Sequence, residues 1–100
     1  MLIVLAKAKL GEGALDAGRE AIAKMVEASN AEEGCLEYTF TVDVVDPSNL
    51  HIVEKWVDDA ALIAHFQTPH MVAFNAAISQ LDVTIVEAMK YHSDDGAPLM

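Results

Sequence analysis

The sequence of 100 residues has little positive charge and a single cysteine. Six lysine and arginine residues stand against 16 acidic residues, which gives a formal net charge of −10. Nucleic-acid binding depends on neutralising phosphates, so this balance argues against a nucleic-acid-binding protein. Cys35 alone excludes an internal disulfide and any metal site with several cysteine ligands. In "GCLEY" we interpret it as a small strand residue rather than a nucleophile.

The sequence also lacks a long hydrophobic run. No apolar stretch approaches the roughly 20 residues of a membrane helix. The N-terminal "MLIVLAKAKL" holds Lys7 and Lys9 inside its apolar stretch, whereas a signal peptide has its positive charge ahead of it. We therefore expect a cytoplasmic protein that makes no contact with a membrane. Yet 53% of the residues are hydrophobic, which is rich for one small domain and predicts that apolar surface is buried in a homodimer.

The apolar spacing predicts a strand over 2–10, a helix over 14–29 and a hairpin over 35–57 that turns at "DPSN". A helical region follows, broken at "QTP", and the last strand ends near residue 92. Asp58 is the expected N-cap of its first helix, and Thr68 followed by Pro69 is the expected start of its second. Strict alternation predicts that one strand face of the hairpin carries Leu36, Tyr38, Phe40 and Val42, and that one face of the last strand carries Val83, Ile85, Glu87, Met89 and Tyr91.

This order, β-α-β-β-α-β, predicts an α+β fold of the ferredoxin-like class, in which two helices cover one face of a four-stranded antiparallel sheet. The other face, with some of the strand aromatics, would need a cover, and the sheet of a second subunit would complete a dimeric α/β barrel. We expect one domain over 1–92 and a flexible C-terminal tail over 93–100.

Four motifs then resemble a known family. They are "E-G-C-L-x-Y" from Glu33, "D-P" from Asp46, "E-x-W-x-D" from Glu54 and "A-H-x-x-T-P-H" from Ala64. In this order they resemble the antibiotic biosynthesis monooxygenase (ABM) family of small dimeric α/β-barrel proteins. The resemblance implies one of several activities: oxidation of quinols or polycyclic phenols by O₂ without metal, flavin or haem, isomerisation of a phosphorylated autoinducer breakdown product, or haem degradation. The haem-degrading branch uses an asparagine on the first strand, which "LAKAKL" lacks.

The resemblance also places the "AH..TPH" segment at the border of the family's cavity. A cofactor-free oxygenase needs a base near neutral pH, and histidine is the natural candidate. We predict His65 as the base and His70 as its orienter or a second donor. The predicted substrate pocket has aromatic walls and one carboxylate, and consists of Tyr38, Phe40, Glu54, Trp56, Phe66 and Phe74.

No metal and no cofactor are predicted. His51, Glu54, His65 and His70 are suitable ligand types, but no pair among them has the close helical spacing of a metal motif. The predicted function is therefore a homodimeric, cofactor-independent monooxygenase that oxidises a small aromatic substrate, a quinol or related phenolic compound, with O₂. Two alternatives stay open. One is an isomerase of a small phosphorylated ketone, although Arg19 is the only arginine available to bind phosphate. The other is a dimer that binds a small molecule without catalysis.

Overall fold

The computed structural model describes all residues, 1–100, and confirms the predicted order of elements. The elements are β1 (Leu2–Leu10), α1 (Ala14–Asn30), β2 (Cys35–Val42), β3 (Asn49–Trp56), α2 (Asp59–Phe66), α3 (Pro69–Ile78) and β4 (Val83–His92). The second helical region is indeed divided, since α2 ends at Phe66 and α3 begins at Pro69. None of the three helices is long and apolar enough to cross a membrane.

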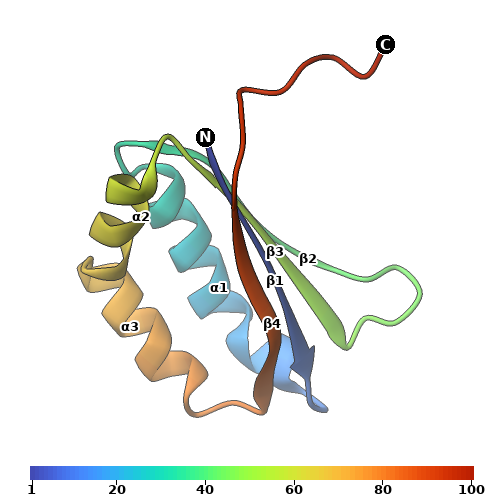
Figure 1. Ribbon diagram of the computed structural model, residues 1–100. Coiled ribbons are helices and arrows are strands. Elements are labelled where there is room, and N and C mark those ends of the chain that lie inside the picture. Colours follow the sequence, from blue (N-terminus) through green and yellow to red (C-terminus); the bar gives the residue numbers. More distant parts are fainter.

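The four strands form one sheet in the order β2-β3-β1-β4, and every neighbouring pair is antiparallel. All three helices lie on the same face of this sheet, with α1 next to α3, as Figure 1 shows. The fold is therefore the predicted ferredoxin-like α+β fold.

The core lies between the helices and the sheet, in two clusters at opposite ends. The first consists of Leu2, Met25, Tyr38, Trp56 and Leu62. The second consists of Ala8, Leu10, Ala14 and Leu50. Burying each large apolar side chain stabilises the fold by roughly 1.5–3 kcal/mol. Trp56, which is fully buried, anchors the first cluster, and the candidate active site is built around it.

Two strand irregularities correct the predicted alternation. Cys35 pairs with Trp56 and Glu37 with Lys55, so Leu36 is an extra residue and is 56% exposed, while Cys35 packs on the core. A bulge of this kind shifts the side chains on one side of it to the other face.

In β4 the irregularity falls between Ile85 and Glu87, which pair with Ala8 and Lys7. Paired residues share a sheet face. Ile85 therefore faces the helices, whereas Glu87, Met89 and Tyr91 face away from them, and the predicted single face of the last strand is wrong.

Two side-chain caps fix the break between the second and third helices. The Asp58 carboxylate accepts a hydrogen bond from the backbone N–H of Ala61 at 2.9 Å, which begins α2. The Thr68 hydroxyl accepts from the N–H of Met71 at 3.3 Å and donates to the carbonyl of His65 at 2.8 Å. Both predicted caps are confirmed. Together they place His65 in the last turn of α2 and His70 in the first turn of α3.

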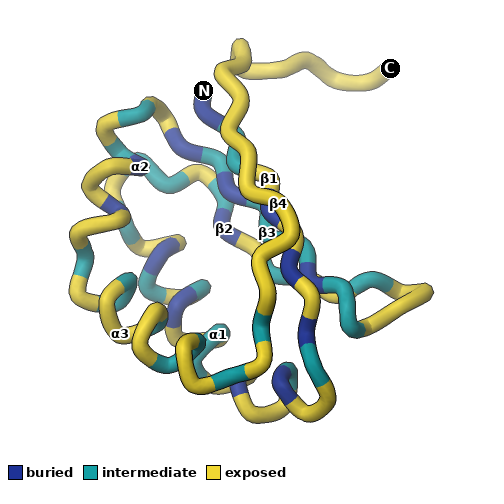
Figure 2. Tube along the Cα trace, turned by 60° about the horizontal axis from the view of Figure 1, so that its bottom comes forward, coloured by how far each residue is buried: buried dark blue, intermediate teal, exposed yellow.

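The sheet face away from the helices keeps exposed apolar side chains. Leu5, Met89 and Tyr91 on it are 45–47% exposed. Tyr91 is the one strand aromatic there, since Tyr38, Phe40 and Trp56 pack on the helix side. The edge strand β4 is exposed along nearly its whole length, and residues 93–100 form no helix or strand and extend away from the sheet (Figure 2).

Candidate active site

The centre of the candidate site is one carboxylate oxygen that contacts two histidines. Oε2 of Glu32 lies 2.6 Å from Nδ1 of His65 and 2.7 Å from Nε2 of His70. These short distances are typical of hydrogen bonds assisted by charge. The three residues come from the turn after α1, the last turn of α2 and the first turn of α3. The cluster therefore joins all three helices at one end of the molecule.

The cluster defines which nitrogen of each histidine carries a proton. A carboxylate only accepts hydrogen bonds, so both ring nitrogens that face Glu32 are N–H donors. In the neutral rings the lone pairs then lie on Nε2 of His65 and Nδ1 of His70. Each histidine is thus held in a defined tautomer with one nitrogen able to take a proton.

The turn that carries Glu32 is held by its backbone. The N–H of Glu32 donates to the carbonyl of Ser29 at 3.1 Å, and its carbonyl accepts from the N–H of Cys35 at 3.2 Å. Gly34 in this turn has φ of +86°, a conformation that favours glycine. A Cβ there would lie 2.8 Å from Cβ of Ala61 on α2. The glycine therefore lets the turn lie against the helix that carries His65.

His65 is surrounded by aromatic rings and is almost fully buried, at 1% exposure. Its ring centroid lies 4.8 Å from that of Trp56 and 5.3 Å from that of Tyr38. His70 is more accessible, with 25% of its side chain exposed. The two histidines thus differ in what they can reach: His65 is enclosed by protein, and His70 borders solvent.

A second buried carboxylate lies near the cluster. Nε1 of Trp56 donates a hydrogen bond to Oε1 of Glu54 at 3.0 Å. Burial raises the pKa of Glu54, and the Trp56 hydrogen bond and the nearby His65 only partly offset this effect. Burial, and then the charge of Glu54, also raise the pKa of the Tyr38 hydroxyl. Tyr38 therefore stays a neutral hydroxyl across the physiological range.

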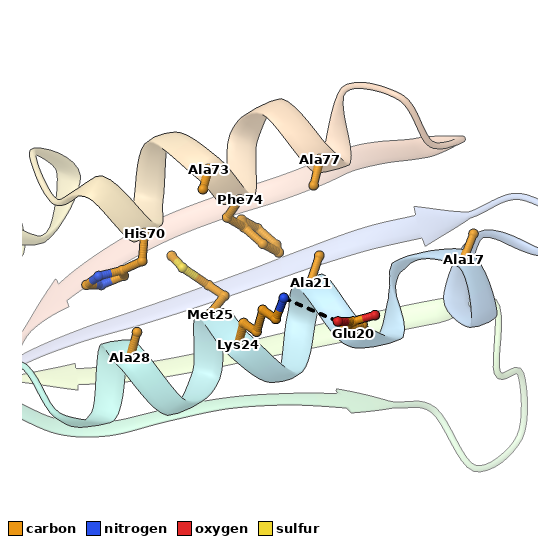
Figure 3. Close-up of a pocket in the computed structure, with 10 residues that line it drawn as sticks. All are labelled: Ala17, Glu20, Ala21, Lys24, Met25, Ala28, His70, Ala73, Phe74 and Ala77. Atoms are coloured by element: carbon orange, nitrogen blue, oxygen red, sulfur yellow. Dashed lines mark ion pairs between the residues drawn. The ribbon is translucent and has the colours of Figure 1, made fainter.

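His70 opens onto a groove of about 580 Å³ between α1 and α3. Figure 3 shows His70 at one end of it, with Met25 and Phe74 beside it. Five alanines on the facing sides of the two helices leave this space because their side chains are short: Ala17, Ala21, Ala28, Ala73 and Ala77. Lys24 and Glu20 line the groove as an ion pair of 3.2 Å. Among the three residues of the cluster, His70 alone lines this groove.

The predicted site residues fall into three groups. His65 and His70 meet through Glu32, and Tyr38, Glu54 and Trp56 lie buried beside His65. Phe40 and Phe74 form an edge-to-face pair, 5.8 Å between centroids, further along the helix–sheet layer. Phe66 is 56% exposed next to His65 and does not line the groove.

Glu32 is the residue that sequence reasoning missed. It lies 33 residues before His65 and 38 before His70, so no local spacing joins them. The available signal was "EEG", two acids directly before the glycine that precedes β2. Glu33 belongs to the family-like motif, but its neighbour makes the contacts.

Glu32, His65 and His70 are also donors of the types that hold a divalent metal. Their Glu–His separations of 2.6 and 2.7 Å are hydrogen-bond lengths. Ligands about 2.0–2.2 Å from one ion keep roughly 3 Å between them. In this arrangement the three residues are joined by hydrogen bonds.

Comparisons with known proteins agree with the fold and the motifs. Residues 1–77 match the family model described as Antibiotic biosynthesis monooxygenase. The Escherichia coli K12 protein described as "Probable quinol monooxygenase YgiN" is 34% identical over an alignment of 88 residues, and the match covers 78% of this chain and 85% of that protein. A solved structure described as antibiotic biosynthesis monooxygenase is 32% identical, with a TM-score of 0.77 over 98% of this chain and 100% of that one.

A crystal structure from Deinococcus radiodurans has the same fold, with a TM-score of 0.89 over 100% of this chain and 99% of that one, at 23% identity. Together, the family-model match over 77 residues and the relative at 34% identity confirm the expected family and enzyme class, an oxidoreductase of the monooxygenase type. This chain belongs to the antibiotic biosynthesis monooxygenase family.

Proposed function

We propose that this protein is a cofactor-independent monooxygenase that oxidises a quinol or a related phenolic compound with O₂. The reaction balances without an external reductant. A quinol gives up two electrons to become a quinone and two more when a ring C–H becomes C–OH. One oxygen atom enters the product and the other leaves as water, so quinol and O₂ yield a hydroxyquinone and water.

The observation that carries this proposal is the pair of histidines held by Glu32 at the end of the groove. A quinol reacts with O₂ once it has lost a proton, so the protein must supply a base within reach. His65 was the predicted base, but its ring is enclosed by protein, while His70 borders the groove. We therefore assign the first proton transfer to Nδ1 of His70 and a supporting role to His65.

Glu32 would strengthen this base. When His70 takes a proton it becomes an imidazolium, and the carboxylate 2.7 Å from Nε2 stabilises the new charge. His65 holds the same oxygen from the buried side, at 2.6 Å. A carboxylate fixed between two rings cannot turn away from His70, so the base keeps one orientation.

The groove suits a flat aromatic substrate. Phe74 lies four residues after His70, so both side chains are on one face of α3. Phe74 and Met25 form an apolar wall beside His70, the proton acceptor (Figure 3). An aromatic ring against Phe74 would place its hydroxyl group toward His70.

The phosphorylated-ketone isomerase is less well supported. Binding a phosphate group calls for free cations. Lys24, which lines the groove, is paired with Glu20, and Arg19 lies on α1 beside Asp16, 3.4 Å away. Each of these two cations thus already has an acidic partner.

We also propose that the protein works as a homodimer. Leu5, Met89 and Tyr91 expose apolar surface on the sheet face that the helices leave open. A second copy of this face is the matching cover, since two like sheets pack by their apolar side chains.

Oxygen consumption with a panel of reduced quinols, in the presence of a metal chelator, tests the reaction. With ¹⁸O₂ we expect one labelled atom in the product and one in water. Uptake that requires added flavin or metal would contradict the proposal. So would stoichiometric hydrogen peroxide without label in the product, because that result would indicate simple oxidation of the quinol.

A further inference from the structure

A second cavity lies in the helix–sheet layer, on the far side of Phe74 from His70. It offers about 40 Å³ of space and is lined by 12 side chains, all of them hydrophobic. Its walls come from the sheet, through Ala8, Leu50 and Ile52, and from the helices and their ends, through Ile22, Ile78 and Leu81. We call this space the apolar pocket.

The composition of the pocket decides what can occupy it. A buried water needs two to four polar partners, and an apolar cavity of this kind stays dry or takes up small apolar guests such as xenon. The volume suits a guest of a few atoms. Dioxygen is such a guest, because it is small, uncharged and a poor hydrogen-bond acceptor.

The pocket is also adjacent to the proposed reaction site. Phe74 lines both the groove, with His70, and the apolar pocket. Phe40, on the sheet, packs edge-to-face against Phe74 and lines the pocket as well. The side chain of Phe74 therefore borders both a guest in the pocket and a substrate in the groove.

The pocket reaches the edge of the sheet. Ile85 belongs to its wall and is 59% exposed at the edge strand β4. A gas that entered at this edge would not have to pass a substrate bound beside His70, because His70 lines the groove and not this pocket.

We propose that the apolar pocket is a dioxygen site that supplies O₂ to the groove past Phe74. This inference rests on the proposed function, since it requires O₂ as the second substrate. It assigns the pocket to the oxidant and leaves the groove to the aromatic compound.

Xenon is the first probe, because its binding needs no turnover. In methyl-labelled protein under xenon pressure, with argon as the reference, we expect shifts at the methyl groups of Leu50, Ile52 and Ile78 and none at Ile63. Ile63 is 57% exposed on α2 and lies outside the pocket. Equal shifts at Ile63, or none in the pocket, would overturn the inference in the wild-type protein.

Filling the pocket gives the second test. Ile78→Phe should abolish the xenon shifts and raise the KM for O₂ severalfold, while the KM for the quinol and the rate at saturating O₂ stay unchanged. Ile63→Phe is the matched control and should change none of these. A rise in the quinol KM instead would mean that the pocket holds an apolar part of the substrate, which overturns the assignment to O₂.

The two proposals can fail separately. Absent xenon shifts in a protein that consumes oxygen would remove the dioxygen site alone. Xenon shifts in a protein that consumes no oxygen with any quinol would count against the proposed function and against a role in supplying O₂.

Discussion

The change Glu32→Gln tests the centre of the site through stability alone. Glu32 is 13% exposed at its side chain and makes two hydrogen bonds, to His65 and His70. A glutamine has nearly the same shape and can still accept both bonds through its carbonyl oxygen, but without charge. The substitution therefore isolates the contribution of the negative charge.

The expected loss follows from the kinds of hydrogen bond. A bond to a charged group contributes about 1.5–3 kcal/mol and a neutral one about 0.5–1.5 kcal/mol. For two bonds we expect the free energy of unfolding to fall by about 2 kcal/mol. In a domain of this size that lowers the Tm by roughly 8–16 °C.

Thermal or urea unfolding of the wild type and Glu32→Gln measures this loss. Glu33→Gln is the matched control, because Glu33 is the exposed neighbour, and it should stay within about 0.5 kcal/mol of the wild type. In the background of His70→Gln, the effect of Glu32→Gln should shrink, since one of its bonds is already changed. If Glu32→Gln were as stable as Glu33→Gln, the charge at Glu32 would not hold the two histidines.

Three further predictions concern the surroundings of the site. Burial raises the pKa of Glu54. Between the ordinary carboxyl pKa and this raised pKa, the folded protein retains a proton that the unfolded chain has released. The free energy of unfolding therefore falls as the pH rises from the first pKa to the second. Glu54→Gln keeps an acceptor for Trp56 and should raise the Tm at pH 7 but not at pH 4. Glu27→Gln, at an exposed position on α1, is the control and should do neither. Gly34→Ala should lower the free energy of unfolding more than Gly13→Ala. Both glycines have positive φ (86° and 76°), so each substitution should cost about 1–3 kcal/mol from the backbone, but only at Gly34 would the new Cβ meet a neighbour. Equal losses in unfolding experiments would contradict the contact with Ala61. Met89→Glu places a charge on the open sheet face and should convert the dimer into monomers in sedimentation experiments. Val72→Glu, at a position 65% exposed on α3, is the control and should leave the dimer intact. A monomeric wild-type protein would refute the dimer.

Local signals in the sequence were enough for the elements and their ends. The hairpin and the helix starts depend on neighbours in the chain: the "DPSN" turn, the Asp58 cap, and Thr68 followed by Pro69. The topology followed, since short connections and right-handed crossings leave few ways to arrange these elements. This is why the fold class was predicted correctly.

Strand faces beyond the bulges could not be predicted. A bulge at Leu36 or after Ile85 adds one residue without leaving a mark in the hydrophobic pattern, and it reverses the side-chain alternation that follows. Tyr91 was correctly assigned to an alternating strand, but its face was fixed by pairing with Ile3.

The candidate site could be predicted only in part, for a similar reason. The two histidines were found because "AH..TPH" is a local motif. Glu32 was missed because its contacts depend on how the turn after α1 packs against two later helices. The division of roles between His65 and His70 likewise depends on burial, which the sequence does not display.

The most direct test of the account is the rate of oxygen consumption by His70→Gln compared with His92→Gln. Both histidines donate from Nε2 to a carboxylate at 2.7 Å, but His92 contacts Asp59 on the surface, away from the groove. With a reduced quinol and a chelator present, we predict that His70→Gln loses at least about 100-fold in kcat, the usual contribution of a general base, while His92→Gln keeps the wild-type rate. Equal rates in a folded His70→Gln protein would contradict the assignment of His70 as the base.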